Sequence, residues 1–345
     1  MYLSSKLEVR NLQISFRTDA GNLHAVRNIS FSLEKGRTLA IVGESGSGKS
    51  VTSRAIMGLL ADNAVVEGGQ ILLDGEDLLQ FSPAQWCAAR GRRIAMVFQD
   101  PLSCLNPVMQ VGKQITEAMR NSGLTRTQAR QRAIELMGEV GIPQPHRRFH
   151  DYPFQLSGGM RQRIVIAIAL ASDPEVLICD EPTTALDVTI QAQILELINR
   201  LKRERNLSVI FITHDLGVVA EVADDIAVMY AGKIVEYGAA EEVFYDPRHP
   251  YTWALLASVP DLDTNEKLEA IPGTPPDLTA PPVGDAFAPR NRYALEIDFQ
   301  QEPPMFAVSD THWAATWLLH AYAPPMQPPP AVARRIARAG EGAEE

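Results

Sequence analysis

The stretch GESGSGKS, from Gly43 to Ser50, contains the residue types and the spacing that bind phosphate. Glycines at this spacing let the backbone curl, so that several N–H groups point at one anion. Lys49 adds a point charge, and the Ser50 hydroxyl is placed to ligate Mg²⁺. The apolar run TLAIV precedes the stretch, and the helical pattern SVTSRAIMGLL continues from it. We therefore predict a cradle for the β- and γ-phosphates of a nucleotide, formed by Gly43, Glu44, Ser45, Gly46, Ser47, Gly48, Lys49 and Ser50.

Two adjacent carboxylates, Asp180 and Glu181, end the buried-strand pattern VLIC. Beside a phosphate cradle, a carboxylate at a strand end is suited to holding Mg²⁺. We expect Asp180 to do so, either directly or through water. Glu181 is then placed to polarise the attacking water, as a general base or as an orienting group. This pair predicts that the bound nucleotide is hydrolysed.

Three further residues are candidates for the same site. Gln99 follows the short apolar run MVF, and its carbonyl can reach Mg²⁺ or the attacking water. His214 follows the strand pattern SVIFIT, which is rich in β-branched residues, and an imidazole there can donate a hydrogen bond to the γ-phosphate. Phe16 lies in the strand-rich segment before the cradle and can stack on adenine.

The stretch LSGGMRQR, from Leu156 to Arg163, predicts a second anion-binding surface. Ser157, Gly158 and Gly159 leave backbone N–H groups accessible, and the apolar run IVIAIALA behind them favours a helix. The positive end of that helix would face the glycines. One chain with two phosphate-binding surfaces suggests that the second surface serves a neighbouring molecule.

The pattern of elements indicates an α/β fold. The segment up to Gly36 alternates apolar and polar residues with a turn at Ala20-Gly21-Asn22, and Asp74-Gly75 marks a hairpin, so antiparallel strands are expected there. From about Pro101 to Ala171 the pattern is helical, with a capping box at Thr125 and Gln128. Strands that alternate with helices predict a parallel sheet made of TLAIVG, EVLICD, SVIFIT and IAVMYAG.

Composition excludes several classes of protein. The formal net charge of −10 over 345 residues argues against general nucleic-acid binding. No run of uncharged apolar residues reaches membrane-spanning length, and MYLSSKLEVR has no signal-peptide core, so we expect the chain to stay in the cytosol. The cysteines Cys87, Cys104 and Cys179 have no metal-binding or disulfide spacing.

The C-terminal part has a different composition. Prolines are dense from Ile271 to Pro289, which favours an irregular segment wrapped on the rest of the protein. HPYTWALLASVP carries an apolar face of Tyr251, Trp253 and Leu256 that is suited to packing. We find no acid, base or nucleophile arrangement here and expect the segment to dock rather than to catalyse. Residues 324–345 are expected to be disordered.

Five motifs occur in a specific order: the P-loop, Gln99, LSGGMRQR, LICDEPTTALD and ITHD. In this order they resemble an ABC transporter ATPase. The resemblance implies a P-loop NTPase of ABC type, with a parallel core sheet, an antiparallel β subdomain and a helical signature subdomain at about 101–171. It implies an ATPase domain at 1–260, with LSGGM as the signature motif, Asp187 in the D-loop and His214 as the switch histidine.

The same resemblance explains the second anion-binding surface. In this family two ATPase domains pack head to tail, and each ATP lies between the P-loop of one and the signature motif of the other. Ser157 and Gly159 would therefore bind the γ-phosphate held by a partner subunit. ATP would join the two subunits, and its hydrolysis would release them.

A narrower resemblance covers nearly the whole chain. DPRHPYTWALLASVPDLD followed by IPGTPPDL looks like the C-terminal extension of the dipeptide/oligopeptide importer branch, assigned here to 261–323. This implies a peripheral subunit on the cytoplasmic face of the inner membrane. The expected partners are a second ABC ATPase (a paralogue or an identical chain), two transmembrane permeases and an extracytoplasmic substrate-binding protein, with no nucleic acid.

Two alternatives remain open at this point. An importer of the same branch can carry another cargo, such as nickel, glutathione or a glycoside. A non-transport ABC ATPase of DNA repair, chromosome structure or translation is disfavoured, because no sustained heptads appear between Gln99 and Leu156.

The importer branch typically carries four C-terminal cysteines that ligate an iron–sulfur cluster. In this sequence the matching positions are Asp285, Asn291, Asp298 and Thr316. Oxygen and amide side chains are poor ligands for a cluster that thiolates normally hold. We therefore expect ATP and Mg²⁺, but no iron–sulfur cluster, and a C-terminal extension held by packing and hydrogen bonds.

Overall fold

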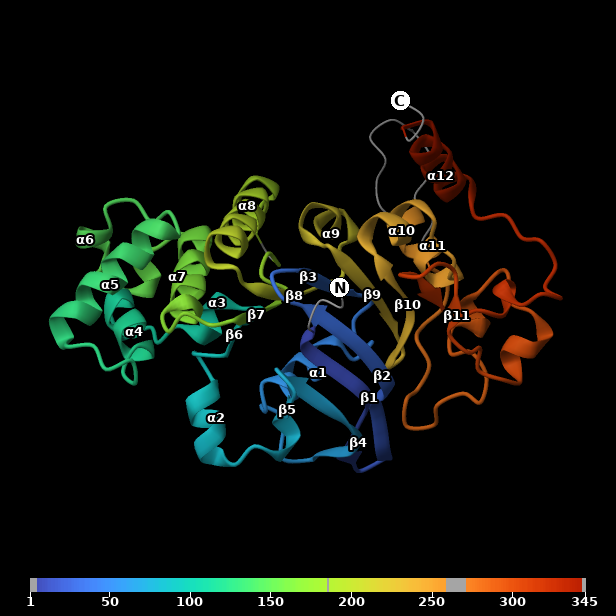
Figure 1. Cartoon of the computed structure of the whole chain (residues 1–345), viewed down its shortest axis with the longest axis horizontal. Coiled ribbons are helices and arrows are strands. Elements are labelled where there is room, and N and C mark those ends of the chain that lie inside the picture. The colour runs from blue at the N-terminus through green and yellow to red at the C-terminus, as the bar shows by residue number, and fades with distance from the viewer. Residues whose placement is uncertain (1–4, 185, 259–270, 343–345) are drawn as a thin grey trace. The chain divides into compact units, whose positions relative to one another are not determined.

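A computed structural model describes residues 5–184, 186–258 and 271–342 (Figure 1). The chain divides into two compact units. The first unit comprises Met1–Lys6, Leu33–Arg37 and Leu79–Ile212. The second unit comprises Leu7–Ser32, Thr38–Leu78 and Thr213–Glu345.

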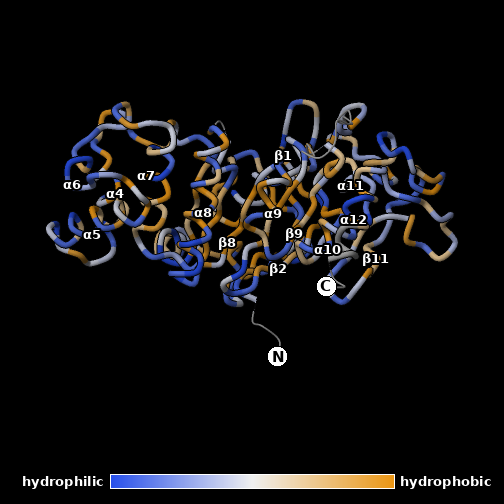
Figure 2. Tube along the Cα trace, turned by 90° about the horizontal axis from the view of Figure 1, so that it is seen from above, coloured by the Kyte–Doolittle hydropathy of each residue, from blue (hydrophilic) through white to orange (hydrophobic). Residues whose placement is uncertain are grey.

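Three parallel strands form the sheet of the first unit: β6 (Ile94–Val97), β7 (Val176–Asp180) and β8 (Ser208–Thr213). Every residue of these strands is buried. Strands covered on both faces read as unbroken apolar runs, which explains why the sequence pattern located β7 and β8. Figure 2 shows the hydrophobic colouring along β8 in the first unit and along β9 in the second.

Helices make up most of the remaining first unit. They are α2 (Pro83–Ala89), α3 (Pro101–Cys104), α4 (Val111–Ala118), α5 (Arg126–Glu139), α6 (Pro145–Arg148), α7 (Gly158–Leu170) and α8 (Val188–Arg205), with short 3-10 turns at Leu78–Gln80 and Pro153–Gln155. The capping box of Thr125 and Gln128 is present at the start of α5. Helices α3, α4 and α5 all pack against α7, which is largely buried. The assignment of 101–171 as a separate subdomain stays a prediction.

The second unit begins with an antiparallel sheet in the order β2-β1-β4-β5. Its strands are β1 (Ser5–Thr18), β2 (Gly21–Glu34), β4 (Ala64–Leu73) and β5 (Glu76–Asp77). The predicted hairpin at Asp74-Gly75 is confirmed, because β4 and β5 pair antiparallel around it. Both turn residues have positive φ, 51° and 84°, as a tight hairpin turn requires.

A second set of strands in this unit carries the loop Gly43–Ser50, which the sequence predicts to bind phosphate. β3 (Thr38–Val42) is parallel to β9 (Asp225–Tyr230), and β10 (Lys233–Ala239) pairs antiparallel with β9. The C-terminal extension adds β12 (Trp313–Ala314) to the edge of β10, followed by β11 (Phe306–Ala307). The helices of this unit are α1 (Lys49–Ile56), α9 (Leu216–Val222), α10 (Ala240–Tyr245), α11 (Pro250–Ala257) and α12 (Pro330–Gly342), with 3-10 turns at Ala288–Arg290, Glu296–Phe299 and Trp317–Leu319.

The expectation of a disordered tail at 324–345 is wrong, because α12 forms within it. Val332 is fully buried, and Ile336, one turn later, packs on the same hydrophobic cluster. Helix α12 lies against α10 and α11 (Figure 1). Burial of this apolar pair helps offset the entropy cost of ordering the helix, a gain that overall composition does not reveal. Residues 343–345 lie outside the described part.

The C-terminal extension docks by packing, as expected. Tyr251, Trp253 and Leu256 are at most 5% exposed and belong to one hydrophobic cluster with Phe287 of the extension. The predicted boundary between 260 and 261 lies among residues outside the described ranges, so the division into 1–260 and 261–323 stays a prediction.

Candidate functional site

The predicted phosphate-binding loop, Gly43–Ser50, leaves the buried strand β3 and enters α1. Gly43 has a φ of 151°, and a Cβ there would lie 2.0 Å from the carbonyl oxygen of Met229. Gly48 has a φ of 102°, and a Cβ there would lie 2.5 Å from the carbonyl oxygen of Ala25. No side chain fits at either position, so the packing of this loop against β2 and β9 requires glycine.

Lys49 and neighbouring backbone hold the loop in shape. The Lys49 side chain is buried, and its Nζ donates to the carbonyl oxygens of Gly43 at 2.6 Å and Glu44 at 2.8 Å. The Gly232 N–H donates to the Ser47 carbonyl at 3.0 Å. Gly46 has a φ of 80° and open space where a Cβ would stand. Hydrogen bonds from Lys49 and Gly232 therefore stabilise the loop, and its backbone is accessible at Gly46.

A cavity of about 320 Å³ adjoins this open side. Its walls come from the loop, from β2, from the end of β9 and from the C-terminal extension, namely Glu44, Ser45, Gly46, Ser47, Leu23, Ala25, Tyr230, Ala231, Pro275, Pro276, Asp277 and Leu278. All of these residues belong to the second unit. Proline-rich sequence after residue 271 thus contributes directly to the surroundings of the loop Gly43–Ser50.

Phe16, His214 and Ser50 belong to this same unit. Phe16 is half-buried near the end of β1, where its backbone pairs with Ala64 of β4. His214 is exposed directly after β8, and Ser50 is half-buried in the first turn of α1. Their assigned contacts with nucleotide or metal stay predictions.

The carboxylates Asp180 and Glu181 lie at the end of β7, in the first unit. Asp180 is buried. Glu181 adopts a left-handed conformation with a φ of 47°, which costs a non-glycine residue about 1 kcal/mol. Its N–H donates to the Ile212 carbonyl of β8 at 2.9 Å, which fixes this turn.

The structure brings Gln99 to Glu181. Gln99 follows β6, the strand beside β7, and its Nε2 donates to Glu181 Oε2 at 2.9 Å. Thr184 Oγ1 donates to the same oxygen at 2.9 Å. Two neutral donors therefore orient the carboxylate. Thr184 was not identified from the sequence, although its position three residues after Glu181 in a turn is a usable signal.

Ser157 begins α7 as its N-cap, with Oγ accepting from the Met160 N–H at 3.3 Å. Gly158 is exposed, whereas Gly159 is buried against Ile190 of α8, where a Cβ would lie 2.7 Å from Ile190 Cγ2. Asp187 is the N-cap of α8, with Oδ1 accepting from the Ile190 N–H at 3.0 Å. Gly159 and Asp187 thus both contact Ile190.

Among the residues with described positions, no group of three or more His, Cys, Asp or Glu side chains could hold a metal ion. The assigned ligands Ser50, Gln99 and Asp180 are oxygen donors, the type that Mg²⁺ prefers. Mg²⁺ commonly uses few protein ligands, together with substrate phosphates and water, so this donor set fits an ion that enters with a nucleotide.

Four side chains occupy the positions of the iron–sulfur cysteines of the importer branch, and each stabilises a local turn. Each side chain accepts a hydrogen bond from a backbone N–H two or three residues away. Asp285 Oδ1 accepts from Phe287 at 3.0 Å, and Asn291 Oδ1 accepts from Tyr293 at 2.9 Å. Asp298 Oδ2 accepts from Leu295 at 2.6 Å, and Thr316 Oγ1 accepts from Leu318 at 3.3 Å. These donor types do not fit a thiolate-bound cluster. The prediction that the protein binds no iron–sulfur cluster remains to be tested by iron analysis.

Comparison with solved structures places this fold in a known class. The chain is similar to the ATP-binding cassette MJ0796 in a dimeric post-hydrolysis state bound to ADP and Pi, with a TM-score of 0.61 and 25% identity over 68% of this chain and 98% of that chain. It is also similar to cbiO1 from Clostridium perfringens, part of the ABC transporter complex cbiONQ, with a TM-score of 0.61 and 28% identity over 70% of this chain and 91% of that chain. The fold is that of an ABC ATPase cassette.

Sequence comparison then identifies the family. Residues 26–184 match the ABC transporter family, and residues 235–297 match the oligopeptide/dipeptide transporter C-terminal region. The oligopeptide transport ATP-binding protein OppD of Bacillus subtilis (strain 168) is 59% identical over 96% of this chain and 93% of its own length. The dipeptide transport ATP-binding protein DppD of Lactococcus lactis subsp. cremoris (strain MG1363) is 58% identical over 93% of each chain. The chain belongs to the ABC transporter family of ATP-binding proteins, and it is an ATPase.

The described helices contain none that is long and apolar enough to cross a membrane.

Proposed function

We propose that this chain is the ATP-hydrolysing subunit of an importer for dipeptides or oligopeptides. The observation that carries the proposal is the near full-length likeness to oligopeptide and dipeptide transport ATP-binding proteins, which includes the C-terminal region beyond the cassette. Because that likeness extends through residues 235–297, it supports this transporter branch rather than a cassette of unrelated use.

In the proposed reaction, backbone N–H groups of Gly43–Ser50 bind the phosphates of ATP, and Lys49 adds positive charge. Phe16 stacks on the adenine, and His214 donates a hydrogen bond to the γ-phosphate. Glu181 polarises the attacking water, with its orientation set by the hydrogen bond from Gln99. Mg²⁺, for which Ser50, Gln99 and Asp180 are the proposed ligands, would neutralise charge on the phosphates.

A second ATPase subunit, identical or paralogous, completes each site in this proposal. Ser157 and Gly159 contact the γ-phosphate held by the partner's P-loop. Gly158 and Asp187 lie on the same surface, which closes against the partner subunit. The exposed N-terminus of α7 supports this assignment, because it presents Ser157 and Gly158 to the outside of the first unit. Its positive end would attract the γ-phosphate.

The proposed assembly also contains two transmembrane permeases and an extracytoplasmic substrate-binding protein. This chain would be a peripheral subunit on the cytoplasmic face of the inner membrane. The ATPase subunit does not itself select the cargo in this proposal, so nickel, glutathione and glycosides are tested as alternatives.

The test is reconstitution of the complex in vesicles, with ATP hydrolysis measured as the loaded binding protein is added. We expect peptide-loaded binding protein to stimulate hydrolysis and peptide uptake. A complex carrying Lys49→Ala should show neither and serves as the control. Stimulation by a nickel complex, glutathione or a glycoside, with none by peptides, would contradict the peptide assignment.

A further inference from the structure

A bidentate ion pair joins the C-terminal extension to the phosphate-binding loop. Arg290 donates from Nη1 to Glu44 Oε2 at 2.6 Å and from Nη2 to Glu44 Oε1 at 2.9 Å. Glu44 directly follows Gly43, and Arg290 lies 246 residues further along the chain. Both residues belong to the second unit. The extension therefore contacts the nucleotide-binding machinery itself.

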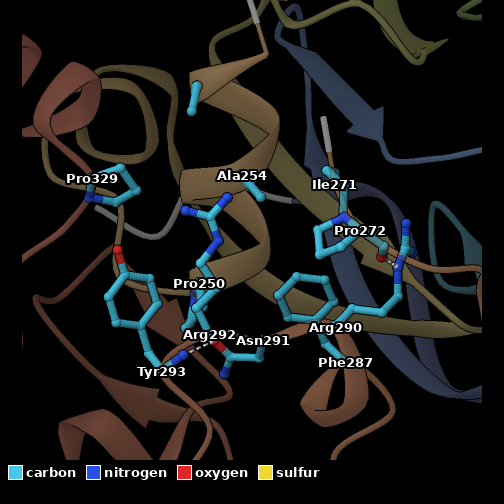
Figure 3. Close-up of a pocket in the computed structure, with 11 residues that line it drawn as sticks. Pro250, Ala254, Ile271, Pro272, Phe287, Arg290, Asn291, Arg292, Tyr293 and Pro329 are labelled. Carbon is cyan, nitrogen blue, oxygen red and sulfur yellow. Dashed lines mark hydrogen bonds between the residues drawn. The ribbon is translucent and has the colours of Figure 1, made fainter. Parts of the chain in front are cut away.

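The surroundings of Arg290 hold its guanidinium in one position. Its side chain is 5% exposed, and Nε donates to the Pro272 carbonyl at 2.7 Å. Nη1 also donates to Tyr230 Oη at 3.1 Å. Figure 3 shows Arg290 beside Pro272 and Phe287, at the margin of a small cavity of about 40 Å³. A guanidinium with its donors fixed in this way can present a rigid fork to a carboxylate.

A second contact holds the backbone of Glu44. Its N–H donates to Tyr251 Oη at 2.7 Å. Tyr251 is fully buried, and its ring packs against Tyr230 and Phe287, with ring centroids 4.6 and 5.2 Å away. Burial raises the pKa of the Tyr251 hydroxyl, which therefore stays protonated. Arg290 of the extension thus holds the side chain of Glu44, and Tyr251 of α11 holds its main chain.

The negative charge of Glu44 gives its ion pair with Arg290 a role in nucleotide binding. Glu44 lines the cavity beside Ser45 and Gly46, and a carboxylate there would repel the negative phosphates of a nucleotide. Arg290 cancels that charge at a distance where the attraction is strong, because its side chain is withdrawn from water. Pro275–Leu278 of the extension line the same cavity, so the extension borders the loop in two places.

We propose that Arg290 is a positioning residue of the nucleotide site, which neutralises Glu44 and fixes the phosphate-binding loop, so that the C-terminal extension sets the affinity for ATP. This inference rests on the proposed role of Gly43–Ser50 in binding nucleotide phosphates. It also revises the expectation that the extension only docks. The extension contributes no catalytic residue, but it fixes the conformation of the phosphate-binding loop.

The test is equilibrium titration of the full-length chain with a fluorescent ATP analogue at low and high salt. Arg290→Gln should weaken binding roughly tenfold at low salt, because Glu44 is left uncompensated. High salt should reduce that loss. The double variant Glu44→Gln/Arg290→Gln should bind within about twofold of Glu44→Gln, because the repelling charge is gone.

Arg292→Gln is the matched control, since it removes the same charge from an exposed position on the same segment. It should bind ATP as the wild type does. Arg290→Lys should give an intermediate loss, because the charge remains but the fork does not. Thermal unfolding of each variant checks that the fold is retained.

Equal binding by Arg290→Gln and the wild type would overturn the inference. A loss that Glu44→Gln fails to rescue would overturn it as well, because a merely loosened extension would not respond to the charge of Glu44. If Arg290→Gln does not fold, Arg290→Lys should still weaken ATP binding at low salt, and unchanged binding would contradict the role of the extension. A wild-type chain that binds no nucleotide would overturn the proposed function itself.

Discussion

Gln99 and Glu181 are joined by a hydrogen bond of 2.9 Å across the ends of two neighbouring parallel strands. The Gln99 amide therefore orients the carboxylate through a neutral hydrogen bond. Glu181 also has a left-handed backbone, with a φ of 47°, directly after β7. Backbone strain of this kind clusters at functional sites.

Replacing Gln99 tests this relationship. Gln99→Glu should lower kcat for ATP hydrolysis at least tenfold, because a second carboxylate beside Glu181 would favour its protonated form. Gln99→Ala should have the smaller effect, since it removes a donor and adds no charge. Phosphate release and ATP binding should be measured on the assembled ATPase pair. A Gln99→Glu enzyme as fast as Gln99→Ala would contradict the proposed role of the Glu181 charge.

The signature motif is predicted to act on a partner's nucleotide. Ser157→Arg should abolish ATP hydrolysis by the assembled pair, because a bulky cation blocks closure, while the isolated chain still binds ATP. Ser157→Ala controls for loss of the N-cap of α7, which costs about 1 kcal/mol of stability. Loss of ATP binding by the isolated Ser157→Arg chain would show that the motif acts on the chain's own nucleotide.

Asp285 should make the stability of the protein depend on pH. Burial raises the pKa of Asp285 from its ordinary value of 3.8 to about 6, with further contributions from Asp298 and Glu302. Between these values the unfolded chain loses a proton that the folded chain keeps. The stability from this group is therefore fully present below about pH 4 and is lost as the pH rises to about 6.

Asp285→Asn should remove that dependence, because the amide oxygen can still accept from the Phe287 N–H. At pH 7 the variant should be more stable by about 1–3 kcal/mol, and at pH 4 the two proteins should be alike. Chemical denaturation at both pH values measures the difference. A variant less stable than the wild type at pH 7 would mean that the ionised carboxylate is favoured in the fold.

The sequence predicts the local elements that carry the candidate site residues. Gly43–Ser50 and the ends of β7 and β8 are recognisable because each motif is short and follows an unbroken apolar run. The hairpin at Asp74-Gly75 and the cap of α5 are likewise local, since a few neighbouring residues determine them.

Long-range contacts are harder to predict. No periodicity links Arg290 to Glu44, because the pairing depends on how the extension packs around Tyr230, Tyr251 and Phe287. Helix α12 was missed because prolines dominate the composition before it, while its stability depends on burial against α10 and α11. Such features follow from tertiary packing rather than from local propensity.

The central claim is that this chain hydrolyses ATP with Glu181 as the residue that activates water. Its most direct test is the Glu181→Gln variant, in which a carboxamide keeps the shape of the side chain but loses its basicity. The variant should be prepared in the assembled ATPase pair beside the wild type, with ATP binding and phosphate release measured on the same samples.

We expect phosphate release to fall at least a hundredfold, a magnitude typical of losing general-base assistance, while ATP binding is retained. The ATP-bound, closed pair should accumulate, because closure no longer ends in cleavage. Phosphate release at near the wild-type rate would contradict the account and would move the water-activating role to another residue.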